Sequence, residues 1–91
     1  MNYVEVTVIG RQNCHLCHEA IELIKPILQH FQNVSLKEVS VDENPALTRI
    51  YSEKIPVIFI NDQEHCFWHI DPERFRKSLV KKGAVVRAES L

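Results

Sequence analysis

Two cysteines separated by two residues are the part of this sequence best suited to chemistry. Cys14 and Cys17 enclose His15 and Leu16, at the point where a predicted strand gives way to a predicted helix. At the start of a helix, unpaired N–H groups and the helix dipole stabilise the thiolate form of a cysteine. The thiolate is the form that attacks disulfides. One helical turn later, Cys17 can reach back and resolve a mixed disulfide. We predict Cys14 as the nucleophile and Cys17 as the resolving thiol.

His15 has two interpretations. A protonated imidazole between the cysteines would favour the thiolate further and make the oxidised pair easier to reduce. An exposed loop histidine without a chemical role is the equal alternative.

A metal site is another use for the same thiols. The cysteine pair could form a tetrahedral zinc site with side chains from elsewhere in the chain, namely His15, His18, His65, Cys66 and His69. No second Cys-x-x-Cys unit is present, and the core is large enough to fold without metal. We therefore predict no metal ligands.

Cys66 is the third cysteine, and it alternates with Trp68 and Ile70 along a predicted strand. This pattern favours a packed core thiol over another redox centre. An odd number of cysteines is more typical of reactive or metal-binding thiols than of a disulfide framework, and without a recognisable export signal we expect a cytoplasmic protein.

Hydrophobic periodicity predicts the elements that position the cysteines. Alternation predicts a first strand over residues 4–9, β-branched residues predict a second over 34–41, and an apolar run predicts a third over 57–60. A turn at 61–64 leads to a fourth strand over 65–70. Helical spacing continues from Leu16 to Phe31 through Pro26, where we expect a kink.

Two further helices are indicated by their first residues. Asn44-Pro45 and Asp71-Pro72 each combine a capping side chain with a proline in the first turn, and Gly83 ends the second helix. The order βαβ then αββα predicts one α/β domain over residues 1–91, with the first two strands parallel. Residues 84–91 show no clear pattern and are treated as a tail.

Composition limits the function classes. The 91 residues are 45% hydrophobic and 25% charged, with a formal charge of -1, which is ordinary for a globular domain. The balance shows no electrostatic footprint for nucleic acid, and no apolar run approaches the length of a membrane span. We expect neither nucleic acid nor membrane as a partner, and a monomer.

With these elements and the cysteine pair, the sequence resembles the glutaredoxin-like proteins of the thioredoxin superfamily. The resemblance is carried by three segments: Val8-Ile9-Gly10-Arg11-Gln12-Asn13-Cys14-His15-Leu16-Cys17, Ile55-Pro56-Val57 and Phe67-Trp68-His69-Ile70-Asp71-Pro72. It implies a thioredoxin fold, β-α-β-α-β-β-α, with a four-stranded mixed sheet and helices on both faces.

The resemblance also implies binding residues. Ile55 and Pro56 would form the loop beside the cysteines, with a cis peptide bond before Pro56 and the backbone of Ile55 pairing with a client chain. Arg11 matches a basic position that helps hold a glutathione carboxylate. Glutathione is not predicted as a firm cofactor, however, because residues 66–69 replace the Gly-Gly pair that receives it in glutaredoxins.

Three function classes follow. The leading one is a thiol-disulfide oxidoreductase acting on a disulfide-containing protein or a small-molecule thiol or disulfide. The second is a metal-binding module, holding zinc or an iron–sulfur cluster shared by two copies. The third is a non-catalytic binding domain that uses the Ile55-Pro56 edge.

Overall fold

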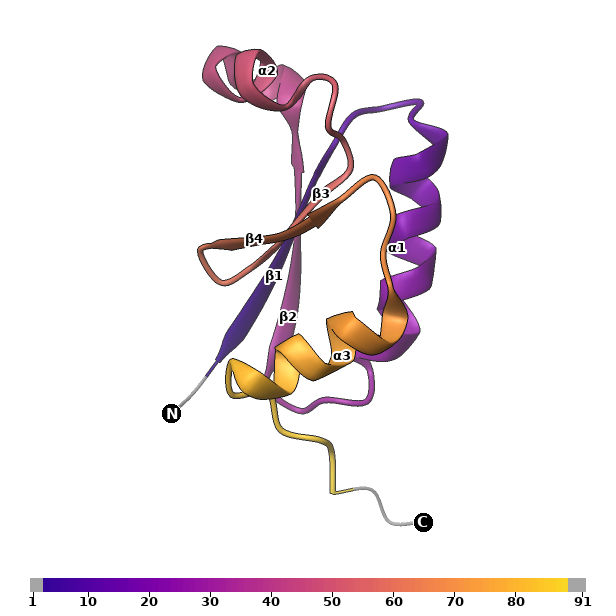
Figure 1. The fold of residues 1–91 in the computed structure, drawn as a ribbon, viewed down its shortest axis with the longest axis vertical. Helices are drawn as coiled ribbons and strands as arrows, with labels where there is room; N and C mark the ends of the chain where they lie inside the picture. The colour runs from indigo at the N-terminus through magenta and orange to yellow at the C-terminus, as the bar shows by residue number, and fades with distance from the viewer. Residues whose placement is uncertain (1–2, 89–91) are drawn as a thin grey trace.

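The computed structural model describes residues 3–88 and has the predicted order of strands and helices (Figure 1). A short 3-10 helix, η1, follows the second strand. The elements are β1 (Val4–Gly10), α1 (His15–Leu28), β2 (Val34–Ser40), η1 (Val41–Glu43), α2 (Pro45–Tyr51), β3 (Val57–Ile60), β4 (Gln63–Phe67) and α3 (Pro72–Lys81).

The four strands form one mixed sheet in the order β2-β1-β3-β4. β1 runs parallel to β2 and antiparallel to β3, and β3 and β4 form an antiparallel hairpin. In this register Val8 on β1 lies between Glu38 on β2 and Ile58 on β3. The α/β thioredoxin fold predicted from the sequence is confirmed.

Helices cover both faces of the sheet. α1 and α3 lie on one face and enclose the larger core, which includes Ile24, Phe75 and Leu79, each fully buried (Figure 1). α2 packs against the other face, where Val41 and Val57 are buried in a smaller core. Within residues 3–88 we find no helix with the length and apolar character needed to span a bilayer.

The predicted helix caps of α2 and α3 are confirmed. Asn44 Oδ1 accepts a hydrogen bond from the N–H of Ala46 at 2.8 Å, and Asp71 Oδ1 accepts from the N–H of Glu73 at 3.0 Å. Each side chain satisfies an N–H group that the helix itself leaves unpaired. Gly83 follows the end of α3 with φ 110°, a conformation that favours glycine.

The predicted bounds of the fourth strand are wrong. β4 starts earlier, at Gln63, and ends at Phe67, because Trp68 turns out of the strand with φ 66°. The pairing of β3 with β4 also shifts between Ile58 and Phe59. Such a bulge places an extra residue on one strand and interrupts the alternation of side chains.

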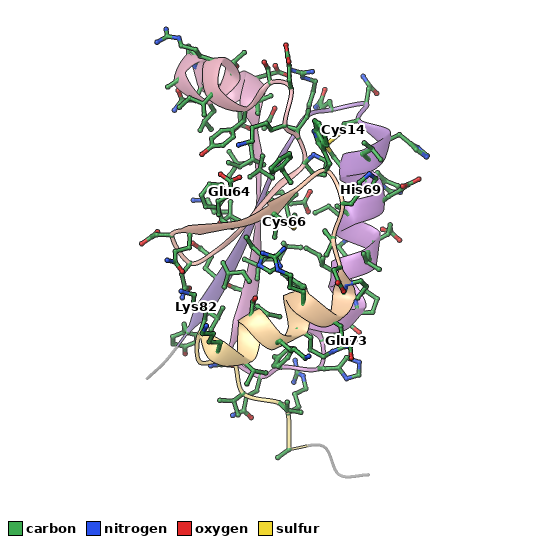
Figure 2. All side chains as sticks on the ribbon, viewed as in Figure 1. Cys14, Glu64, Cys66, His69, Glu73 and Lys82 are labelled. Carbon is green, nitrogen blue, oxygen red and sulfur yellow. A yellow bond between two sulfur atoms is a disulfide. The ribbon has the colours of Figure 1, made fainter. Side chains whose placement is uncertain are left out.

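The predicted grouping of Cys66 with Trp68 and Ile70 is therefore correct only in part. Cys66 and Ile70 are partly buried against the larger core. Trp68 is 49% exposed and lies outside it. Figure 2 shows Cys66 over the middle of the sheet, on β4.

Residues 84–87 pack beside the segment that follows α1. The N–H of Val85 donates to Asn33 Oδ1 at 2.8 Å, and the N–H of Arg87 donates to the carbonyl of His30 at 2.8 Å. Ala84 is buried. This part of the predicted tail thus contacts the domain, whereas residues 89–91 lie outside the described residues.

α1 and α3 differ from the sequence pattern only in detail. α1 continues through Pro26 and ends at Leu28, before the predicted end near Phe31. At the end of α3, Lys82 donates a hydrogen bond to the side chain of Gln63, which ties that end to the start of β4. The kink at Pro26 stays a prediction.

Candidate functional site

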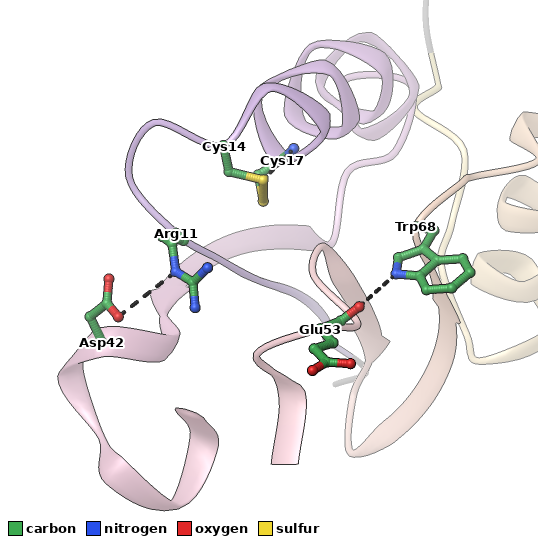
Figure 3. Close-up of a disulfide and its surroundings, with 6 residues drawn as sticks. All are labelled: Arg11, Cys14, Cys17, Asp42, Glu53 and Trp68. Carbon is green, nitrogen blue, oxygen red and sulfur yellow. Dashed lines mark hydrogen bonds and ion pairs between the residues drawn. A yellow bond between two sulfur atoms is a disulfide. The ribbon is translucent and has the colours of Figure 1, made fainter. Parts of the chain in front are cut away.

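Cys14 and Cys17 form a disulfide at the start of α1 (Figure 3). Their Cα atoms are 5.2 Å apart. Asn13 turns the chain with φ 62°, a conformation that asparagine tolerates better than most residues, and Cys14 is the N-cap of α1. The loop after β1 therefore delivers the first sulfur to the end of the helix where N–H groups are unpaired.

The two sulfurs have different surroundings. Cys14 Sγ accepts a hydrogen bond from the N–H of Cys17 at 3.2 Å. Cys14 is partly exposed, whereas Cys17 is 7% exposed. A client can reach the first sulfur more easily than the second, and the N–H group that contacts Cys14 would stabilise its thiolate. The predicted roles of nucleophile and resolving thiol would use this asymmetry, and they stay predictions.

Gly10 lies directly against the resolving cysteine. A Cβ atom built on Gly10 would come within 3.0 Å of Cys17 Sγ and 3.1 Å of its Cβ. A side chain at position 10 would therefore press on the first turn of α1. This contact was not predicted from the sequence, because it depends on how α1 folds back against the end of β1.

A cavity of about 800 Å³ opens beside the disulfide, between α1 and β2. Glu38 faces it from β2, in register with the buried Val8. Glu38 was not predicted as a site residue, although an acid among the β-branched residues of the strand was the available signal. The other ionisable residues of the lining are Arg11, His15, His18, Glu22, Lys25 and Glu43, together with Cys14 and Cys17.

Arg11 lines the same cavity, and its role as a binding residue stays a prediction from the resemblance. Its Nε atom lies 3.9 Å from Asp42 Oδ1 in η1 (Figure 3). Both side chains are well exposed, so the pair is weak and water screens it. A carboxylate on a bound molecule would compete with Asp42 for the guanidinium.

The Ile55-Pro56 peptide bond is cis, as the resemblance implied. Pro56 is fully buried and Ile55 is partly buried against the smaller core. The carbonyl of Pro56 accepts a hydrogen bond from the N–H of Trp68 at 2.9 Å, which joins this loop to the end of β4. Register places the loop at the disulfide end of the sheet, because Val57 pairs with Ile9, the neighbour of Gly10.

Comparison with known proteins decides the family. A model of the glutaredoxin-like domain (DUF836) matches residues 5–80. The chain belongs to this glutaredoxin-like family. The resemblance seen in the sequence is thereby confirmed.

Relatives of the chain include proteins without a described function. An uncharacterised protein of Mycobacterium tuberculosis is 21% identical over 85 residues, which cover 89% of this chain and 88% of the relative. The solution NMR structure of protein Ne2328 from Nitrosomonas europaea is similar with a TM-score of 0.74 and 29% identity, covering 86% of this chain and 93% of that one.

The chain is also similar in fold to thioredoxins. A mutant thioredoxin from Halobacterium salinarum gives a TM-score of 0.67 at 15% identity, covering 94% of this chain and 80% of that one. At this identity the similarity shows the fold alone. The chain is thus a glutaredoxin-like protein with a thioredoxin fold and a cysteine pair at disulfide distance.

The His15 imidazole contacts a glutamate of its own helix. Its Nε2 atom lies 2.6 Å from Glu19 Oε2, one turn along α1, and the imidazole is 84% exposed. This geometry agrees with the interpretation of His15 as an exposed histidine.

The residues of the alternative metal site do not come together. Among residues 3–88 no group of three or more His, Cys, Asp or Glu side chains is placed to hold a metal ion. His65 contacts the ring of Phe75 on α3, with centroids 5.7 Å apart, and Cys66 is partly buried against the larger core. Burial lowers the pKa of His65 and raises the pKa of Cys66.

Proposed function

We propose that this glutaredoxin-like protein is a thiol-disulfide oxidoreductase that uses Cys14 and Cys17. The observation that carries the proposal is the disulfide at the N-terminus of α1, with Cys14 as the N-cap and Cys17 buried behind it. A catalyst of disulfide exchange needs one accessible, activated thiol and a second thiol within reach of it.

In the proposed reaction the reduced pair gives two electrons to a client disulfide. The Cys14 thiolate attacks one client sulfur, which forms a mixed disulfide and releases the other client sulfur as a thiolate. Cys17 then loses its proton to solvent and attacks Cys14 Sγ. This step forms the disulfide seen in the structure and releases the second client thiolate, and both client thiolates take up protons according to their pKa.

The cycle is closed by a second thiol reagent of the cell. A dithiol, or two monothiols in succession, reduces the Cys14–Cys17 disulfide by the same exchange in reverse. No step requires glutathione in particular. The client is a disulfide-containing protein or small molecule, which approaches the partly exposed Cys14 beside Ile55 and Pro56.

The proposal includes where and how the protein works. A reducing compartment keeps the pair available as a dithiol, so we place the activity in the cytoplasm. Both cysteines of the reaction come from one chain, so a monomer is sufficient.

Trapping the mixed disulfide tests the proposal. A Cys17→Ser variant in a Cys66→Ala background should form a stable covalent adduct with a peptide disulfide, because the resolving thiol is missing. Mass spectrometry should find the peptide on Cys14. The matched Cys14→Ser, Cys66→Ala variant should form at least about tenfold less adduct, because Cys17 is buried.

The alternative functions predict different results. A metal-binding module would retain zinc or a visible chromophore after anaerobic purification and lose it in the Cys14→Ser variant. A non-catalytic binding domain would hold its client equally well after Cys14→Ala and Cys17→Ala substitution. Equal adduct formation by the two trapping variants would contradict the proposal.

A further inference from the structure

Trp68 adopts a backbone conformation that is unusual for its residue type. Its φ of 66° lies in the left-handed region, where a bulky side chain costs on the order of 1 kcal/mol or more. Two hydrogen bonds hold it there: the N–H donates to the carbonyl of Pro56 at 2.9 Å and the indole Nε1 donates to the carbonyl of Glu53 at 3.0 Å. The indole is thus fixed against the loop that precedes β3, yet it remains 49% exposed.

The neighbours of Trp68 hold it further. The ring of Phe67 meets the indole edge to face with centroids 5.1 Å apart. Lys54 Nζ lies 4.8 Å from the centroid of Phe67 and 3.4 Å from Glu64 Oε2. The aromatic ring is rigid and half exposed in the free protein. A ligand that packs against it therefore loses little additional side-chain conformational entropy.

Strand pairing places this ring relative to the disulfide. Gly10 contacts Cys17, its neighbour Ile9 pairs with Val57, and Val57 pairs with Phe67. Two strand spacings of about 4.8 Å therefore separate the end of β1 from the end of β4, a lateral distance of roughly 10 Å. Figure 3 shows Trp68 at a place separate from the disulfide, with its indole nitrogen directed at the carbonyl of Glu53.

We propose that Trp68 determines client specificity by binding an apolar side chain about three residues from the reacting cysteine of a protein client. This inference rests on the proposed oxidoreductase function. An extended client rises about 3.3 Å per residue, so three residues cover the roughly 10 Å between the end of β1, behind the disulfide, and the end of β4, beside Trp68. An aliphatic or aromatic side chain buried against the exposed indole gains hydrophobic free energy, whereas a serine at that position does not.

A small-molecule disulfide of a few atoms does not span this distance. It can react at Cys14 without contacting Trp68, so the indole distinguishes protein clients from small ones. The cavity between α1 and β2 is lined with charged groups and offers no comparable aromatic surface. The client segment therefore runs from Cys14 past the partly buried Ile55 toward Trp68.

Peptide selectivity tests this inference. Two peptide disulfides should be compared that differ only in leucine or serine three residues on either side of the reacting cysteine. We expect kcat/KM to favour the leucine peptide about fivefold to tenfold, and the ratio to fall to about one in Trp68→Gly. Glycine adopts φ 66° without strain, so this substitution removes the ring and leaves the backbone path available.

Two controls distinguish contact with the Trp68 indole from non-specific hydrophobic binding of the peptide. Tyr3 is 70% exposed and precedes the far end of β1, so Tyr3→Ser should retain the leucine preference. A peptide with leucine six residues from the cysteine should react like the serine peptide. An equal preference in wild type and Trp68→Gly would overturn the inference.

A spectroscopic measurement needs no substitution at Trp68, which is the single tryptophan of the chain. In the Cys17→Ser, Cys66→Ala adduct, the leucine peptide should reduce iodide quenching of its fluorescence at least about twofold relative to the serine peptide. Equal quenching in both adducts would contradict a contact with Trp68. If neither peptide forms an adduct, the proposed function itself fails, which is a separate and recognisable result.

Discussion

Cys14 and Cys66 have the same side chain in two opposite environments. Cys14 caps the start of α1 and is partly exposed, and its Sγ accepts a hydrogen bond from the N–H of Cys17. Cys66 lies in β4 as a free thiol, partly buried against the larger core. The backbone N–H groups around Cys14 favour a negative sulfur, whereas the apolar surroundings of Cys66 disfavour one.

Under the proposed function, position in the fold, and not residue type, decides which thiol reacts. Burial raises the pKa of Cys66, and Glu64 raises it further, while Arg74 opposes both effects. The thiolate is the reactive form, so Cys66 is held in its inert form at neutral pH. The following predictions test this contrast.

The largest effect should come from removing the nucleophile. Cys14→Ser should lower the rate of peptide disulfide reduction by more than about a hundredfold, because a serine hydroxyl forms no disulfide. Cys66→Ala should leave the rate within about twofold of wild type, because Cys66 plays no part in the exchange. A similar loss in both variants, measured by steady-state kinetics, would remove the distinction between the two thiols.

A substitution at Gly10 tests the packing behind the cysteine pair. Gly10→Ala should lower the free energy of unfolding by about 1–3 kcal/mol, because the new methyl group overpacks Cys17. Urea unfolding under reducing conditions measures this without a contribution from the disulfide. In a Cys17→Ala background, Gly10→Ala should lower the free energy of unfolding by less than it does in wild type. Strictly additive changes in the free energy of unfolding would argue against the contact.

Alkylation compares the two environments in one molecule. In the reduced protein, iodoacetamide should modify Cys14 at least about tenfold faster than Cys66 at pH 7, because each unit of pKa changes the thiolate fraction about tenfold. Peptide mapping after timed quenching gives both rates. In the urea-unfolded protein the alkylation rates of Cys14 and Cys66 should become equal. A rate ratio that persists after unfolding would show that local sequence, and not the fold, causes the difference.

The smallest effect concerns His65, the neighbour of Cys66. Burial, and then the charge of Arg74, lower its pKa, and its Nε2 atom is buried without a hydrogen-bond partner among residues 3–88. The unfolded chain binds a proton near pH 6.5 and the folded chain only at lower pH, so stability should fall as pH falls through 6.5. His65→Leu should reduce this loss between pH 7.5 and 5.5 in urea unfolding, and an unchanged loss would exclude His65 as its source.

Much of the fold could be predicted from local patterns. Some patterns depend only on the residues of their own segment, so they predict that segment without the tertiary structure. They are the alternation in β1, the apolar run of β3 and the caps at Asn44 and Asp71. The family resemblance supplied the cis bond before Pro56, which no local pattern predicts.

The parts that sequence reasoning missed depend on long-range contacts. The alternation of residues 65–70 suggested a strand, but the bulge in β4 and the turn at Trp68 arise from pairing with β3 and with Pro56. Glu38 enters the site only because β2 lies parallel to β1 beside α1. The alternation of residues 66–70 grouped Trp68 with Cys66 and Ile70 on one face of a strand, whereas the structure leaves Trp68 half exposed.

The most direct test of the central claim is a redox titration of the Cys14–Cys17 pair in a Cys66→Ala background. The fraction of disulfide would be read by alkylation mass shift across thiol redox buffers. We predict one two-electron transition between about -120 and -270 mV, where catalysts of disulfide exchange lie. Failure to form an intramolecular disulfide, or one that even the most reducing buffer leaves intact, would contradict an exchange function for this pair.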